Sequence, residues 1–264
     1  MRTGLGMVMG VIALACTAVA AGTAWTGLGT ARDEHYGRGV GLAGDLNGDG
    51  IEEFMVGAVG ANNWTGRVHV HDGATRAIVA TLIGEGLGYR LGGRLTSAGD
   101  FNGDGKPDVA VASVKWGTDQ RGKVSVLSGP VPSLSAPLFS VTGDAGDSLG
   151  DELRGGFDFN RDGFDDILVS SPYNDEGAAD GGNIQVLGGP DGQVLFSRTG
   201  TEAGRSLGIS AGIGDIDADG FLDVIAGSFY SSGTGRVTVY SGLTGGVILR
   251  LDILYGHYRC VVRP

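Results

Sequence analysis

The chain has 264 residues, 52 of them glycine, an apolar content of 41% and a formal net charge of −11. The glycines follow no triplet period, which excludes collagen, and the apolar content excludes a disordered chain, so we expect short strands joined by tight turns. The negative charge argues against nucleic acid or an anionic membrane as a partner.

The first 24 residues predict export. Arg2 precedes an apolar run over residues 7–21, and small residues suited to cleavage follow. We therefore expect residues 1–24 to be a signal peptide, with no membrane span in the mature chain. A lipoprotein signal at Cys16 stays open, as does a periplasmic rather than a secreted, extracellular or cell-surface location. Cys16 lies in the expected signal peptide, so the mature chain has Cys260 as its one cysteine and can form no intramolecular disulfide. We therefore expect bound metal to stabilise the fold in place of disulfides.

An acidic motif then recurs along the chain. Its four copies start at intervals of 55, 58 and 57 residues, a period typical of propellers and solenoids. A bulky residue followed by Gly precedes each copy, and a Gly followed by an alternating apolar segment comes after it. These landmarks define repeats at about 36–84, 91–143, 149–200 and 207–252, within a domain spanning 25–252. We expect residues 253–264 to form an irregular tail.

Each repeat predicts four short strands. The first enters the acidic loop, the second leaves it, the third alternates between apolar and polar residues, and the fourth closes the unit. No window shows a sustained helical period. Four antiparallel strands in a repeat of this length describe a propeller blade, so the expected fold is an all-β β-propeller.

The acidic loops have the composition of calcium sites, because calcium takes six to eight oxygen ligands. Positions 1, 3 and 5 offer short oxygen side chains, position 6 is always Gly, position 7 can offer its backbone carbonyl, and position 9 is always a carboxylate. The predicted ligands, in loop order, are Asp45, Asn47, Asp49, Ile51 and Glu53; Asp100, Asn102, Asp104, Lys106 and Asp108; Asp158, Asn160, Asp162, Phe164 and Asp166; Asp215, Asp217, Asp219, Phe221 and Asp223. About four Ca²⁺ sites are thus expected.

Position 12 excludes a helix-loop-helix calcium sensor, which needs a bidentate Glu there. The residues at position 12 are Val56, Val111, Val169 and Ala226. Glu53 is the only glutamate at position 9, and its longer side chain predicts an altered geometry in the first loop. The side chain at position 7 is expected to be unimportant.

With these "DxNxDGxxD" loops, the chain resembles the FG-GAP repeat family, whose members include the N-terminal propeller of integrin α chains. The resemblance covers about residues 36–252, and its "FG" element stands here as Tyr36-Gly37 or as Leu-Gly. It implies calcium loops on one rim of a propeller and an adhesive or ligand-binding role. It also implies seven blades, whereas this chain has residues for four, so we expect an incomplete ring rather than a closed four-bladed one.

A binding role is favoured over catalysis. The histidines at 35, 69, 71 and 257 have no recognisable third metal ligand, and the paired acids all fall in the loops. The expected partner is an extracellular protein or a glycan, contacted by the variable loops at residues 62–65, 115–121 and 174–180. A carbohydrate-active propeller, either a lectin or a polysaccharide lyase-like enzyme, is the alternative.

Overall fold

The computed structural model describes residue 29, residues 33–129, residue 134, and residues 137–229, 235–254 and 257–261. The expected signal peptide, residues 1–24, lies outside these residues. Within them the fold is all-β apart from one helical turn, α1 (Ala61–Trp64). None of the described helical residues forms a segment long and apolar enough to cross a membrane.

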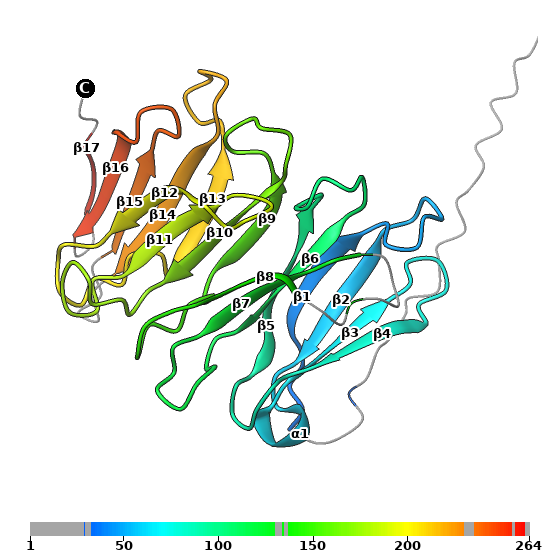
Figure 1. Ribbon diagram of the computed structural model, residues 1–264. Helices are drawn as coiled ribbons and strands as arrows, with labels where there is room; N and C mark the ends of the chain where they lie inside the picture. Colours follow the sequence, from blue (N-terminus) through cyan, green and yellow to red (C-terminus); the bar gives the residue numbers. More distant parts are fainter. Residues whose placement is uncertain are drawn as a thin grey trace, which may run out of the picture.

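The strands form four antiparallel sheets, one for each repeat (Figure 1). In chain order the sheets contain β1 (Tyr36–Gly44), β2 (Glu53–Ala58), β3 (Arg67–His71) and β4 (Ile78–Ile83); β5 (Leu91–Gly99), β6 (Asp108–Ser113), β7 (Lys123–Leu127) and β8 (Pro137–Thr142); β9 (Leu153–Phe157), β10 (Asp166–Ser171), β11 (Asn183–Leu187) and β12 (Val194–Thr199); β13 (Ser210–Gly214), β14 (Asp223–Phe229), β15 (Gly235–Tyr240), β16 (Val247–Leu254) and β17 (His257–Val261). The predicted all-β, four-stranded antiparallel organisation is confirmed.

The second strand of each repeat is the centre of its sheet. All six residues of β6 and all six of β10 are buried, because sheets pack on both of their faces. These strands are rich in Val, Ile and Ala and read as continuous apolar runs, as expected for doubly covered strands. The first strands line the inner side of the arc, where β5 contacts both β1 and β9.

Among the residues that the structure describes, three apolar cores lie between neighbouring sheets, and none lies within a single sheet. Met55 and Val68 of the first sheet pack with Leu95 and Val111 of the second. Equivalent cores join the second sheet to the third and the third to the fourth. Alternate residues of the central strands therefore face opposite neighbours, as the two-residue period of a strand requires.

A backbone seam accompanies each core. The Gly that starts the third strand makes an isolated parallel bridge with the Leu that starts the next repeat. These bridges join Gly66 to Leu91, Gly122 to Leu149 and Gly182 to Leu207. The glycine of the bridge has no room for a side chain: a Cβ on Gly66 would lie 2.2 Å from the Leu91 nitrogen. The bulky-residue–Gly landmark of the sequence is thus one half of the inter-sheet seam.

The arc of sheets is open, which fits the expected incomplete ring (Figure 1). Among the described residues, no core cluster joins the first sheet to the fourth. One expectation was wrong: the tail is not irregular throughout, because β17 pairs antiparallel with β16 from Leu254↔His257 to Arg250↔Val261. An outer strand presents unpaired N–H and C=O groups, and β17 satisfies one edge of β16.

Candidate metal centres

The four acidic loops connect the first and second strands of their sheets and share one backbone path. The Gly at position 6 has a positive φ in every loop, 85° at Gly50 and 81° at Gly105 for example, which confirms the expected sharp bend. Position 4 is also left-handed, even where it is Arg161 (φ 64°) or Ala218 (φ 60°). Two left-handed residues fold nine residues back on themselves.

The carboxylate at position 1 organises this path. In the first loop, Asp45 accepts backbone N–H groups from Gly48 (2.7 Å), Asp49 (3.1 Å) and Gly50 (2.8 Å). Asp100 and Asp158 accept the N–H groups of positions 5 and 6 in the same way. The loop therefore wraps around its first carboxylate, as an oxygen cage around a cation must.

Position 9 lies at the foot of each loop, and its side chain is fully buried in all four repeats. Asp166 accepts the N–H of Phe159 at 2.6 Å and that of Gly189 at 3.0 Å. Asp223 makes the equivalent bonds with Ile216 (2.8 Å) and Gly242 (3.1 Å). The position 9 carboxylate thus ties its loop to the hairpin between the third and fourth strands.

The hairpin partner is a glycine that the sequence analysis missed. The four equivalent glycines are Gly73, Gly129, Gly189 and Gly242, 19 to 23 residues after position 9. A Cβ on Gly129 would lie 2.3 Å from the carbonyl oxygen of Pro107, at position 8 of the loop. The signal was present in the sequence, since a Gly follows every third strand.

Burial disfavours the charged form of two position 9 carboxylates, and one of these also has an oxygen atom without a hydrogen-bond partner. Asp108 accepts the Gly129 N–H with Oδ1 (3.1 Å), but its buried Oδ2 has no hydrogen-bond partner. Burial raises the pKa of Asp108 to about 6, and Asp104 and Asp100 add to the rise. Burial also raises the pKa of Asp166 to about 6. A buried acceptor facing other carboxylates suits a cation.

The fourth loop brings the most charge together. One ligand atom each from Asp215, Asp217 and Asp223 lies within 4.8 Å of the other two, the one such group of three acidic, His or Cys ligands among the described residues. Asp219 is not in this group; its Oδ1 accepts the Phe221 N–H at 2.8 Å. In the first loop, the longer Glu53 reaches Asn47, whose Nδ2 donates to Glu53 Oε1 at 3.0 Å.

Side chains at position 7 have a role that was not expected of them. A Cβ on Gly103, in the second loop, would lie 2.4 Å from the ring of Phe164 in the third, so the two are in close contact. In the same way, the Arg161 guanidinium of the third loop lies 4.1 Å from the ring centroid of Phe221 in the fourth. In the third and fourth loops, position 7 therefore packs on position 4 of the preceding loop.

In the first three loops, the side chain at position 2 enters the core between sheets. Leu46, Phe101 and Phe159 each belong to the apolar cluster that joins their own sheet to the next. Each of these loops is therefore fixed at both ends, by position 2 in the inter-sheet core and by position 9 beneath the strand. Its path is set by packing as well as by its hydrogen bonds.

Two family models match within this chain. The model described as FG-GAP-like repeat matches residues 44–111, and the model described as FG-GAP repeat matches residues 150–187. The chain carries FG-GAP repeats. Both matched segments include an acidic loop and the strand that follows it.

The FG-GAP repeats are distantly similar to integrin α chains. The chain is 31% identical to integrin alpha-IIb of Homo sapiens over 236 residues, which cover 79% of this chain and 21% of that protein. It is 28% identical to integrin alpha pat-2 of Caenorhabditis briggsae over 213 residues, 71% of this chain and 17% of that protein. The chain thus spans about a fifth of the length of these relatives.

Solved structures overlay on the FG-GAP repeats only loosely. Rhamnogalacturonan lyase PL11 of Bacillus licheniformis has a TM-score of 0.46 and 15% identity, covering 81% of this chain and 50% of that one. The Dos1 propeller has a TM-score of 0.44 and 14% identity, covering 77% and 44%. Overlays this loose carry no weight for function.

The two histidines on β3 are engaged in structural contacts. His71 Nδ1 lies 3.0 Å from the Arg76 carbonyl and its Nε2 lies 2.9 Å from the Tyr36 hydroxyl, while its ring stacks on Phe54. His69 Nδ1 lies 3.0 Å from the Thr81 hydroxyl. These contacts hold both rings against the outer face of the first sheet.

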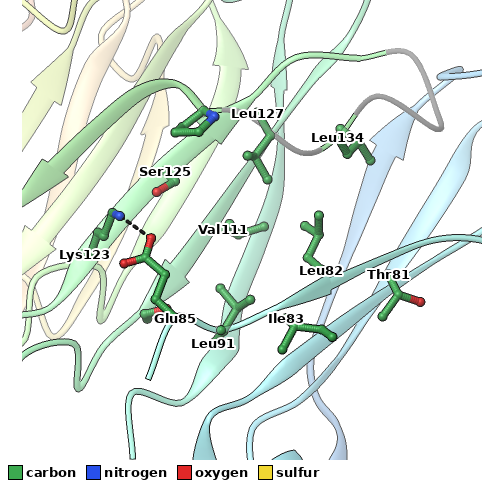
Figure 2. Close-up of a pocket in the computed structure, with 13 residues that line it drawn as sticks. Thr81, Leu82, Ile83, Glu85, Leu91, Val111, Lys123, Ser125, Leu127 and Leu134 are labelled. Carbon is green, nitrogen blue, oxygen red and sulfur yellow. Dashed lines mark hydrogen bonds and ion pairs between the residues drawn. The ribbon is translucent and has the colours of Figure 1, made fainter. Parts of the chain in front are cut away.

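A hollow of about 290 Å³ lies between the outer parts of the first and second sheets. Figure 2 shows Leu82, Leu91 and Val111 along it and an ion pair between Glu85 and Lys123 at one side. Glu85 also accepts the Trp116 indole N–H at 2.8 Å. The carboxylate of Glu85 and the amine of Lys123 are therefore paired with each other in this hollow.

The variable loops lie at the opposite end of the strands from the acidic loops, because they connect second to third strands. A cleft of about 320 Å³ separates the segment Leu87–Arg90 from the loop at 115–121. Tyr89, Arg90, Lys115 and Gln120 line it. Nearby, the Tyr89 and Trp116 rings lie 5.8 Å apart, and Arg90 lies over Trp64.

Proposed function

We propose that this chain is a calcium-binding β-propeller module for adhesion or ligand binding, in which calcium is structural. The observation that carries the proposal is the loop of nine residues, built four times with a wrapped carboxylate at position 1 and a buried carboxylate at position 9. The partnerless Oδ2 of Asp108 and the Asp215, Asp217 and Asp223 group support it.

Calcium would be held by the oxygens of positions 1, 3, 5 and 9 and by the carbonyl of position 7 in each loop. These donors are carboxylates, amides and a backbone carbonyl, the hard oxygen ligands that calcium prefers. Bound calcium supplies positive charge that offsets the repulsion among these carboxylates. The protein's own groups fix the loops in place: position 9 attaches each loop to the following hairpin, and position 2 attaches the first three loops to an inter-sheet core.

We propose binding rather than catalysis for three reasons. The acidic clusters are placed to hold metal, the histidines of β3 are engaged in structural hydrogen bonds, and Glu85 in the hollow of Figure 2 is paired with Lys123. Ligand contacts are assigned to the variable loops at 62–65, 115–121 and 174–180. The cleft beside Tyr89 and Lys115 supports that assignment.

The proposed setting is outside the cell, secreted or on the cell surface, with the periplasm as the bacterial equivalent. The N-terminal sequence of apolar and small residues supports export. The proposed partner is an extracellular protein or a glycan. The net charge of −11 supports the absence of a nucleic-acid role.

Thermal unfolding in EDTA, calcium and magnesium tests the metal. A ligand that binds only the folded state stabilises by RT ln(1 + [L]/Kd), which is about 2.7 kcal/mol per site at a hundredfold excess over Kd. We expect the melting temperature to drop in EDTA and to be restored by calcium more effectively than by magnesium. A melting curve that does not change on metal removal would overturn structural calcium.

Binding to glycan and extracellular-matrix protein arrays tests the ligand role. We expect binding to be lost when the loop at 115–121 is exchanged for that at 174–180, and to survive Asp104→Ala in a protein that still folds. Turnover of a polysaccharide that disappears on changing a residue outside the acidic loops would overturn the binding proposal in favour of catalysis.

A further inference from the structure

In the described part of the chain, the two outermost sheets each carry a core-type face with no sheet packed on it. Three inter-sheet cores inside the chain use one arrangement: the second-strand residues at position 11 and the loop residue at position 2 of one sheet pack on the first and second strands of the next. The fourth sheet has residues at positions 2 and 11 but no following sheet for them to pack on. The first sheet has the first and second strands but no preceding sheet packed on them.

On the fourth sheet, the equivalent residues are apolar but uncovered. Position 2 of the acidic loop is buried as Leu46 and Phe101, whereas Ile216 is 51% exposed. Position 11 is fully buried as Met55 and Leu168, whereas its equivalent Ile225 is only partly buried.

Ile225 lines a shallow hollow of about 250 Å³ together with Val237 and Gly227. In the three preceding sheets the place of Val237 is taken by Val68, Val124 and Ile184, all fully buried. The outer face of the fourth sheet is thus shaped like an inter-sheet surface that lacks its neighbour.

The first sheet shows the complementary half. Val40 pairs with Val56 just as Leu95 pairs with Val111 and Leu153 with Val169, so the three residues are equivalent. Leu95 is 7% and Leu153 1% exposed, but Val40 is 70% exposed and Leu42, on the same face, is 59% exposed. Exposed core-type residues gathered on one face indicate an interaction surface.

We propose that a second copy of this chain covers both faces. The fourth sheet of one copy would pack on the first sheet of the other, and the reverse contact would close a ring of eight blades. The interface continues the inter-sheet packing that the chain already uses three times. Eight blades lie within the range of four to eight that is typical of propellers, and such a head-to-tail contact closes only if the rotation between copies permits it.

This inference goes beyond the ligand-binding role and is tested without any ligand. Light scattering coupled to size exclusion, over a dilution series of the purified chain, should give twice the monomer mass. Val40→Glu and Ile225→Glu should each give monomers, because each variant loses one half of every interface. Val194→Glu is the matched control: it introduces the same charge at a position that is 51% exposed on the third sheet, and it should leave the dimer intact.

Mixing the two variants tests whether the fourth sheet of one copy contacts the first sheet of the other. The Val40→Glu copy keeps its fourth-sheet face and the Ile225→Glu copy keeps its first-sheet face, so an equimolar mixture should form a one-to-one dimer through a single interface. Leu42→Glu is a second first-sheet variant should Val40→Glu fail to fold. A wild-type monomer at every concentration, a dimer that survives either variant, larger open-ended species, or no association in the mixture would overturn the proposal.

Discussion

Replacing Asp166 with Asn separates the structural role of a position 9 carboxylate from its proposed role toward calcium. Asp166 is buried and accepts two backbone N–H groups, from Phe159 at 2.6 Å and from Gly189 at 3.0 Å. Asn retains one carbonyl oxygen for one of them but turns an NH₂ group toward the other. An unsatisfied buried donor costs about 1–3 kcal/mol, and removal of a charge that burial disfavours offsets part of that cost.

In EDTA we therefore expect Asp166→Asn to lower the free energy of unfolding by at most about 3 kcal/mol. In excess calcium the wild type gains stabilisation at this loop and the variant does not. The gap between them should widen by about 2.7 kcal/mol when calcium is a hundredfold above Kd. Urea unfolding in both buffers, followed by fluorescence, measures the two differences.

Asp191→Asn is the matched control, since it removes the same charge from an exposed residue of the hairpin that holds Gly189. It should leave the unfolding free energy nearly unchanged in both buffers. A loss for Asp166→Asn that is equal in EDTA and in calcium would refute the reasoning. It would show that Asp166 acts only as a hydrogen-bond acceptor.

Three further predictions concern single side chains. Asp104→Ala should remove one equivalent of calcium in a calorimetric titration, whereas the exposed Lys106→Ala should be silent because only its carbonyl is used; equal losses would mean that the loop geometry is wrong. Gly129→Ala should lower the urea midpoint by the equivalent of about 1–3 kcal/mol, since its Cβ would lie 2.3 Å from the Pro107 carbonyl oxygen, and an unchanged midpoint would contradict that contact. Burial, aided by the nearby Arg67, lowers the pKa of His69 below 6.5, so the folded state resists protonation and stability should fall as the pH drops below that value. The pH dependence of the melting temperature should flatten in His69→Asn, and an identical dependence would exclude His69 as its source.

Much of the fold could be predicted because its signals are local. The Gly at position 6 predicts a left-handed bend. The alternation of apolar and polar residues in segments such as 67–71 predicts a half-buried strand. The predicted ligands Asp45 and Asp100 could be placed in their loops from the sequence, because the backbone N–H groups that surround each of them lie within the five residues that follow it.

The remainder depends on contacts between distant segments. The bond between Asp166 and Gly189 spans 23 residues, and the packing of Phe164 on Gly103 joins two different repeats. The Gly after every third strand is visible in the sequence, but no local pattern indicates that it binds the position 9 carboxylate or that Phe164 packs on Gly103. The short, partly polar segment of β17 carries a weak strand signal, and its pairing follows from the free edge of β16.

The parallel bridges between sheets constrain how such an array can gain or lose repeats. Each bridge joins the Gly that starts a third strand to a Leu that belongs to the following repeat, as Gly122 joins Leu149. Deletion of a segment shorter or longer than one period would remove the Leu partner of one Gly. Removal or duplication of one whole period instead supplies an equivalent Leu to pair with that Gly. The intervals of 55, 58 and 57 residues are compatible with this seam, and insertions should be tolerated in the loops between strands rather than at the bridged Gly and Leu themselves.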